Sequence, residues 1–190
     1  METTTVEALM LGPNGWVPNN PYLPVLIYRS ALTARAPDGT ARRFEMIVGG
    51  NGWPAQWRNG VYDFDHYHST AHEVLGVAAG SARLALGGPE ARIVAVTAGD
   101  VLLLPAGTGH CRIEASRDFL VVGAYPAGQS LDICRQHPTE AMRRTIAGLP
   151  FPGRDPVFGA GGPLVRHWRV AGTRCEPVSD DRRHGREARR

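Results

Sequence analysis

Glycine and proline divide the middle of this 190-residue chain into short segments, and this division limits the folds that it can adopt. Turn-forming residues occur at Gly80-Ser81, Gly87-Gly88-Pro89, Ala98-Gly99-Asp100 and Gly107-Thr108-Gly109. Between and around these turns lie apolar or alternating stretches that we predict to be strands: residues 61–68, 73–79, 82–86, 92–97, 101–104, 110–114 and 119–125. Short strands at intervals of roughly 8–12 residues are typical of antiparallel sandwiches and barrels. The sequence therefore predicts an all-β fold.

The flanking regions are expected to complete this body. Residues 22–28 and 44–48 are predicted to be strands, and so are residues 6–11, although Thr4 and Glu7 also fit a capping box. Residues 139–149, TEAMRRTIAGL, have a helical pattern. Proline and glycine then favour an extended wrap, and the charged end is typical of disorder. We therefore divide the chain into N-terminal strands with a barrel-covering segment, a core, a C-terminal helix with its wrap, and a disordered tail, at residues 1–59, 60–126, 127–172 and 173–190.

Composition excludes several classes of function. No apolar run reaches the roughly 18–20 residues of a membrane span, and the first residues lack the pattern of a secretory signal. The three cysteines form no CxxC pair, so we expect a cytoplasmic protein. The net charge is +3, but the body of the chain carries no basic stripe, which argues against a nucleic-acid partner. All 21 basic residues are arginines, which excludes a lysine Schiff base.

Residues 66–73, HYHSTAHE, place three of the seven histidines and a carboxylate close together in the sequence. On a strand, side chains two residues apart project from the same side about 6–7 Å apart, so His66 and His68 can converge on one ion. Glu73 has an odd offset from His68, so the intervening residues must bend the chain before its carboxylate joins them. Residues 99–110, GDVLLLPAGTGH, supply a further neutral ligand in His110.

These two segments resemble the paired motifs of the cupin superfamily. The first motif is matched by Gly60, His66, His68, Glu73 and Gly80, and the second by Gly99, Pro105, Gly107 and His110. Glu114 stands where the family often has asparagine, at a position that is not a ligand. Flanking stretches such as NNPYLPVLIYR are similar to those of small single-domain bacterial cupins of the YjlB type. The resemblance implies a single double-stranded β-helix, the RmlC-like jelly-roll barrel, and two copies pairing as a homodimer.

The resemblance also implies one divalent transition metal, namely Fe, Mn, Ni, Co, Cu or Zn, because imidazoles with one carboxylate suit these ions. Its ligands would be His66, His68, Glu73 and His110. His72 would replace Glu73 if the gap between the motif positions were one residue shorter, but the distance to Gly80 favours Glu73. On an octahedral ion, four protein ligands leave two positions for water, O2 or substrate.

The catalytic residues stay open, with His72, Arg112 and Glu114 as candidates. Counting from His110 along a strand places Arg112 and Glu114 on the inward face, where Arg112 either grips a substrate anion or pairs with Glu114. Aromatic residues are expected to close the barrel mouth or to pack: Trp53, Trp57, Tyr62 and Tyr125. We expect a metal-dependent cupin enzyme acting on a small-molecule substrate, and dioxygenase-type oxidation is the reaction that we favour. The alternatives are a metal-dependent isomerase, decarboxylase or hydrolase, and a non-catalytic binding protein.

Overall fold

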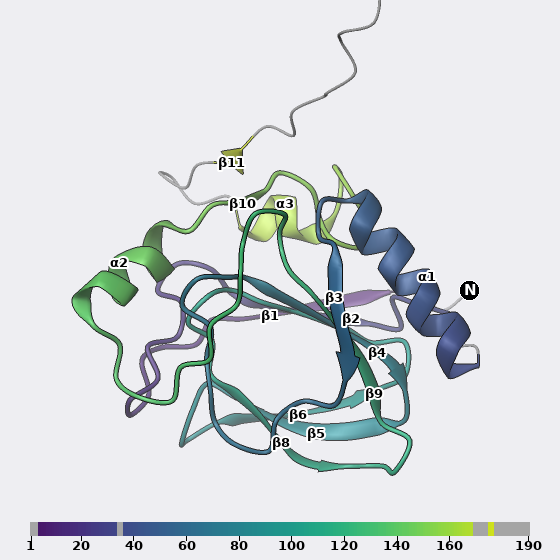
Figure 1. Ribbon diagram of the computed structural model, residues 1–190, viewed down its shortest axis with the longest axis horizontal. Coiled ribbons are helices and arrows are strands. Elements are labelled where there is room, and N and C mark those ends of the chain that lie inside the picture. The colour runs from purple at the N-terminus through teal and green to yellow at the C-terminus, as the bar shows by residue number, and fades with distance from the viewer. Residues whose placement is uncertain (1–3, 34–35, 169–174, 177–190) are drawn as a thin grey trace, which may run out of the picture.

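The computed structural model describes residues 4–33, 36–168 and 175–176, and two antiparallel sheets face each other in it (Figure 1). The larger sheet contains, in spatial order, β1 (Thr5–Leu9), β2 (Val25–Arg29), β7 (Val101–Leu104), β4 (Glu73–Ala79), β9 (Leu120–Ala124) and β3 (Ala55–Asn59). The smaller sheet contains β6 (Arg92–Thr97), β5 (Ser81–Leu86) and β8 (His110–Ala115). This architecture confirms the predicted all-β jelly-roll fold.

The space between the sheets is filled from alternate positions of the strands. Leu75 and Val77 of β4 belong to the same buried cluster as Leu84 and Leu86 of β5. Successive side chains on a strand point to opposite faces, so Glu73 lies on the inward face that continues through Leu75. The first residue of β4 therefore brings a carboxylate into the space between the sheets.

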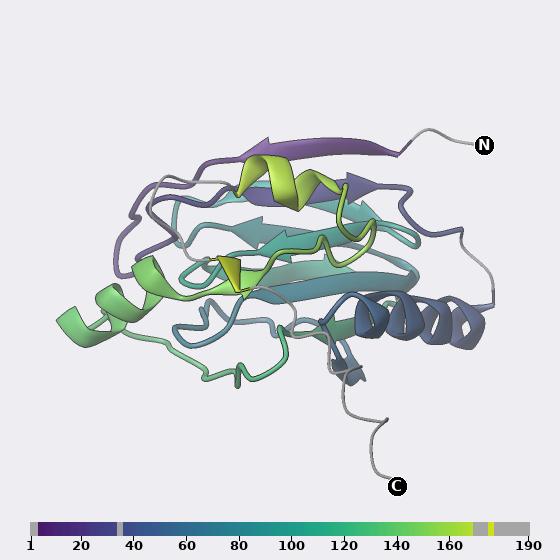
Figure 2. The ribbon, with the colours of Figure 1, turned by 90° about the horizontal axis from the view of Figure 1, so that it is seen from above.

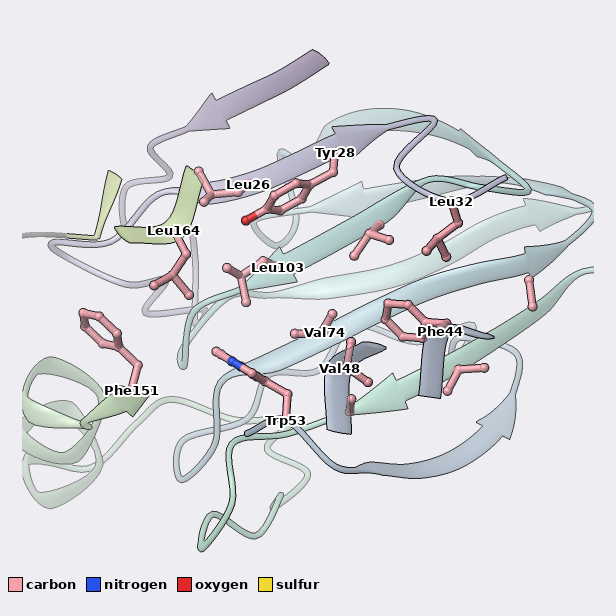
Figure 3. Packing of buried hydrophobic residues seen from close by; sticks show 14 of the residues in the cluster. Leu26, Tyr28, Leu32, Phe44, Val48, Trp53, Val74, Leu103, Phe151 and Leu164 are labelled. Atoms are coloured by element: carbon pink, nitrogen blue, oxygen red, sulfur yellow. The ribbon is translucent and has the colours of Figure 1, made fainter. Parts of the chain in front are cut away.

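A second core covers the outer face of the larger sheet, beneath α1 (Pro37–Gly50) (Figure 3). Phe44 and Val48 of this helix pack in one buried cluster with Val74 of β4. A Cβ atom at Gly76 would lie 2.5 Å from the Phe44 ring, so a glycine is needed there. Strand β4 is consequently buried on both faces.

The prediction that residues 44–48 form a strand is wrong, because they belong to α1. The buried side chains Thr40, Ala41, Phe44 and Val48 recur at helical spacing, whereas Met46 is 71% exposed. Such a stripe buries one face of a helix on a sheet. Pro37 at the start also favours a helix, since its fixed φ fits the first turn.

The C-terminal part begins with α2 (Glu140–Gly148), which confirms the predicted helix. Its N-cap is Thr139, whose side chain accepts a hydrogen bond from the backbone N–H of Met142 at 3.2 Å. From α2 the chain returns over the outer core through β10 (Phe151–Pro152) and α3 (Pro163–His167) (Figure 2).

Asp155 fixes this returning segment to the larger sheet. Its buried carboxylate accepts hydrogen bonds from the hydroxyl of Tyr28 at 2.8 Å and from the backbone N–H of Leu164 at 2.9 Å. Strand β10 also pairs in parallel with β11 (Cys175–Glu176). Apart from β11, the predicted disordered tail at 173–190 lies outside the described residues.

Two further differences from the predicted strands concern residues 55–68. Residues 61–68 form no strand and make only isolated bridges, between His66 and His110 and between Tyr67 and Cys134. The strand in this part of the chain is instead β3 (Ala55–Asn59), which was not predicted. Within the described ranges, no helix has the length and apolar character that crossing a lipid bilayer requires.

Candidate metal centre

Three buried imidazoles meet between the sheets. His66 and His68 come from the irregular segment before β4, and His110 is the first residue of β8. A two-way backbone bridge joins His66 to His110, with the His110 N–H donating at 2.9 Å and the His66 N–H donating at 3.3 Å. One nitrogen from each of the three rings lies within 4.8 Å of the others. The structure thus brings together three predicted metal ligands from two separate segments.

All three rings are oriented by backbone carbonyl groups at Nδ1. The partners are the carbonyls of Phe64 for His66 at 3.1 Å, of Thr108 for His110 at 3.0 Å, and of Asp132 for His68. A carbonyl oxygen only accepts, so Nδ1 carries the proton in each neutral ring. The lone pair is then on Nε2, which is the tautomer that binds a metal through Nε2.

The predicted bend between His68 and Glu73 is present, and Asp132 stabilises it. Its carboxylate accepts hydrogen bonds from the backbone N–H of Ser69 at 2.6 Å and from the Ser69 hydroxyl at 2.5 Å. It also accepts from the backbone N–H of Thr70 at 3.3 Å. The same residue therefore holds both the turn and, through its carbonyl, the ring of His68.

Glu73 lies beside two of the three imidazoles. Its Oε2 is 3.2 Å from Nε2 of His110, and its Oε1 is 3.5 Å from Nε2 of His68. In the tautomer with the proton on Nδ1, Nε2 of His110 presents a lone pair to Oε2 and not a donor. Oε2 is buried and has no hydrogen-bond partner among the described residues. An unpaired buried carboxylate oxygen is costly, and a cation between Glu73 and the rings would satisfy it.

The electrostatics of the site also favour a cation. Burial opposes the charge of Glu73, but the attraction of His68 outweighs it and holds the pKa of the carboxyl well below its usual range. Burial and the neighbouring His110 lower the pKa of His66 to about 3, so this ring is neutral at physiological pH. For His68, burial again opposes the charge, and the attraction of Glu73 raises its pKa. One carboxylate among imidazole donors fits a transition metal better than Ca²⁺ or Mg²⁺.

A cavity of about 260 Å³ adjoins these four side chains. Its other walls come from β3 and the residues that follow it, together with one residue of β4 and two of the loop after β9: Trp57, Arg58, Asn59, Gly60, Val61, Tyr62, Leu75, Tyr125 and Leu131. The ring of Trp57 lies against β9, where a Cβ atom at Gly123 would come within 2.0 Å of it. Gly123 therefore makes room for this aromatic wall.

Arg58 is the one cationic side chain among the described residues that line the cavity. Its guanidinium is engaged by two carboxylates of α1, with Nε 2.6 Å from Glu45 and an Nη atom 2.7 Å from Asp38. The cavity thus offers a substrate anion little attraction apart from that of a bound metal.

His72 does not join the imidazole cluster. Its Nδ1 accepts a hydrogen bond from the backbone N–H of Ala106 at 3.0 Å, and its Nε2 lies 3.2 Å from the carbonyl of Leu149. The ring is fully buried against Trp168 in the outer core. Both nitrogens are therefore used in joining backbone segments, and Glu73, not His72, faces the imidazole cluster.

Neither Arg112 nor Glu114 lines the cavity, and the prediction that Glu114 faces inward is wrong. Arg112 pairs with Leu84, which faces the space between the sheets, so counting from His110 holds as far as Arg112. The pairing of β5 with β8 shifts register between Arg83 and Leu84, so Glu114 points outward and lies 3.2 Å from Arg83. Arg112 is partly exposed and lies 3.8 Å from Asp63. A bulge reverses the alternation of side chains, and parity counted from His110 fails beyond it.

The sequence predicts that Trp57 and Tyr125 close the barrel mouth or pack, and it missed the hydrogen bonds that connect them to a candidate ligand. The Tyr125 hydroxyl donates to Oε1 of Glu73 at 2.6 Å and accepts from Nε1 of Trp57 at 2.7 Å. Tyr125 follows β9, so its position near the neighbouring β4 was predictable, but the hydrogen bond was not. Asp132 was missed as well, because it belongs to neither of the two motifs.

A scan against protein-family models finds no match. The protein YjlB of Bacillus subtilis is 35% identical over 157 residues, which are 82% of this chain and 92% of YjlB. Among solved structures, the DMSP lyase DddQ from Ruegeria pomeroyi aligns with a TM-score of 0.32 and 16% identity, over 69% of this chain and 50% of that one. The 11S globulin from Wrightia tinctoria aligns with a TM-score of 0.33 and 12% identity, over 76% of this chain and 34% of that one. This chain thus spans half or less of either solved protein.

Proposed function

The chain belongs to the family of the Bacillus subtilis protein YjlB, and we propose that it is a metal-dependent enzyme acting on a small organic molecule. One observation carries the proposal: the unpaired buried Oε2 of Glu73 faces imidazole nitrogens beside a cavity. The ligands of one divalent transition metal would be His66, His68, Glu73 and His110. When bound, such an ion supplies redox or Lewis-acid chemistry to a substrate in the cavity.

The lining of the cavity defines what the protein contributes. The carbonyl groups at Nδ1 hold the three rings in one orientation, so little reorganisation is needed. Trp57, Leu75 and Leu131 form an apolar wall that displaces water. Since Arg58 is already paired with carboxylates, we propose a small substrate with little charge.

Oxidation by O2 is the reaction that we propose first. Apart from the four candidate ligands, no carboxylate or imidazole lines the cavity in the described part of the chain, so no obvious general base stands ready there. A reaction that depends on the metal for its chemistry fits such a lining better than one that depends on a side-chain base.

A second candidate is metal-assisted isomerisation, decarboxylation or hydrolysis, and Tyr62 is the observation that favours it. Tyr62 lines the cavity, stacks on Phe64 with ring centroids 4.7 Å apart and meets the edge of His66 at 5.1 Å. Its phenol is the group that could transfer a proton to or from a substrate next to the imidazoles.

Metal content and oxygen uptake test the proposal together. Untagged protein should contain about one transition-metal ion per chain by elemental analysis. The His110→Ala variant should contain almost none, and His137→Ala, which removes an exposed histidine, should match the wild type. Wild-type stoichiometry in His110→Ala would overturn the metal centre.

Fe(II)-loaded protein should then consume O2 with a panel of small uncharged substrates. If the protein turns over a substrate without O2, and if Tyr62→Phe loses that activity, the second candidate is favoured over oxidation. A bound metal with no turnover under any condition would leave a binding protein.

A further inference from the structure

A directed chain of hydrogen bonds ends on Glu73. Nε1 of Trp57 lies 2.7 Å from the Tyr125 oxygen, which lies 2.6 Å from Oε1 of Glu73. An indole N–H only donates, so the Tyr125 oxygen accepts from Trp57 and its single proton points to Glu73. The chemistry of the three groups therefore fixes the direction of both bonds.

These two hydrogen bonds make the two carboxylate oxygens of Glu73 unequal. Oε1 accepts the phenol proton, whereas Oε2 has no hydrogen-bond partner in residues 4–33, 36–168 and 175–176. A carboxylate that accepts a short hydrogen bond on one oxygen presents the other oxygen to a cation. Tyr125 itself is 1% exposed and keeps little surface for contacting a substrate.

We propose that Tyr125, oriented by Trp57, is a positioning residue that restricts Glu73 to binding the metal through Oε2 alone. A carboxylate bound through both oxygens occupies two coordination positions, and one bound through a single oxygen occupies one. The hydrogen bond thus keeps one more position of the ion open toward the cavity. This inference rests on the metal centre proposed above.

The placement of Trp57 supports this role. Its ring is seated against β9 because Gly123 has no side chain, and its backbone pairs with Gly123 across the sheet. Strand β3 therefore places the indole N–H of Trp57 next to the phenol of Tyr125, which lies two residues after Gly123. The orientation of Tyr125 is fixed from a neighbouring strand.

Co(II) binding tests the inference, because its visible spectrum reports coordination and its affinity can be measured by chelator competition. We expect wild type to bind one Co(II). Tyr125→Phe should also bind one, about 10- to 100-fold more weakly, as is usual when an outer hydrogen-bond partner of a ligand is lost. Its spectrum should change, since both oxygens of Glu73 become free to bind. Trp57→Phe should show a smaller change in the same direction, and Tyr22→Phe, at an exposed tyrosine, should match wild type.

The possible failures are distinguishable. Wild-type protein that binds no Co(II) would overturn the proposed function. Normal Co(II) binding with an unchanged spectrum and affinity in Tyr125→Phe would overturn only the positioning role. If circular dichroism shows Tyr125→Phe to be unfolded, Trp57→Phe decides, and a wild-type spectrum in that variant overturns the inference.

Discussion

Two regions on opposite faces of the larger sheet contain buried histidines, and they use the imidazole in different ways. Between the sheets, His68 is anchored at Nδ1 and its Nε2 faces Glu73. In the outer core, His72 has both nitrogens bonded to backbone groups, of Ala106 and Leu149. Both rings are buried, so burial does not separate them. The hydrogen-bond partners do: a ring with one nitrogen left over is available to a ligand, and a ring with none joins segments.

Removing an imidazole of the metal centre should have the largest effect on binding and a small one on stability. In His110→Ala we expect metal affinity to fall by more than the roughly 10–100-fold that loss of an outer partner costs. The ring adjoins a cavity, so its loss leaves the packing of both cores intact. Competition titration gives the affinity and urea unfolding of the metal-free protein gives the stability. The comparison breaks if His110→Ala unfolds as easily as the His72 variant described next.

Removing His72 should do the reverse. His72→Ala leaves the N–H of Ala106 and the carbonyl of Leu149 unpaired in a buried site and opens a cavity beside Trp168. We expect a loss of about 2–4 kcal/mol of unfolding free energy, measured by urea denaturation. Metal stoichiometry should stay at one per chain below the unfolding midpoint. Loss of metal in a still-folded His72→Ala protein would contradict the separation of the two regions.

Gly76 tests the outer core alone. A methyl group there would meet the ring of Phe44 at 2.5–2.7 Å, so Gly76→Ala must displace α1. Overpacking of this kind costs about 1–3 kcal/mol, which thermal or urea unfolding will show. Metal affinity should be unchanged, because Gly76 faces away from the cavity. An altered affinity would mean that strain crosses β4 from one face to the other.

The pH dependence of stability offers the smallest and most specific test. Burial lowers the pKa of His72 to about 4, whereas an unfolded histidine titrates near 6.5. Between these values the unfolded chain binds the extra proton, so this histidine's contribution to stability falls as the pH drops from 6.5 and levels off below 4.

The same effect is absent from His72→Gln. The stability difference between wild type and His72→Gln should therefore shrink by about 1 kcal/mol from pH 6.5 to 5.5 in urea titrations. A difference that is constant with pH would mean that the ring accepts a proton in the folded state.

The sequence predicts the central strands well because turns rich in glycine or proline separate most of them. Residues 73–79, 92–97 and 101–104 were predicted with the bounds that the structure has. The N-terminal helix was not predicted, because residues 44–48 are a short apolar run of the kind that strands also have. Its helical stripe becomes evident only when Thr40 and Ala41 are included.

The proposed metal centre was predictable as far as the motifs reach. The spacing of His66, His68, Glu73 and His110 anticipates the cluster, but the groups around it come from distant segments. Asp132 lies 63 residues after Ser69, and Tyr125 lies 52 residues after Glu73. Glu114 was misplaced because a bulge in β8, between Arg112 and Glu114, leaves no mark in the sequence. Local patterns identify candidate ligands, whereas the hydrogen bonds that orient them depend on tertiary structure.

X-ray absorption by the zinc-loaded protein tests the central claim most directly, since the scattering pattern of imidazole identifies histidine ligands. We expect the fine structure of one bound zinc to contain three imidazoles and at least one oxygen at about 2.0–2.2 Å. A first shell with one imidazole or none, or one containing sulfur, would contradict the assignment of the metal centre to these four side chains.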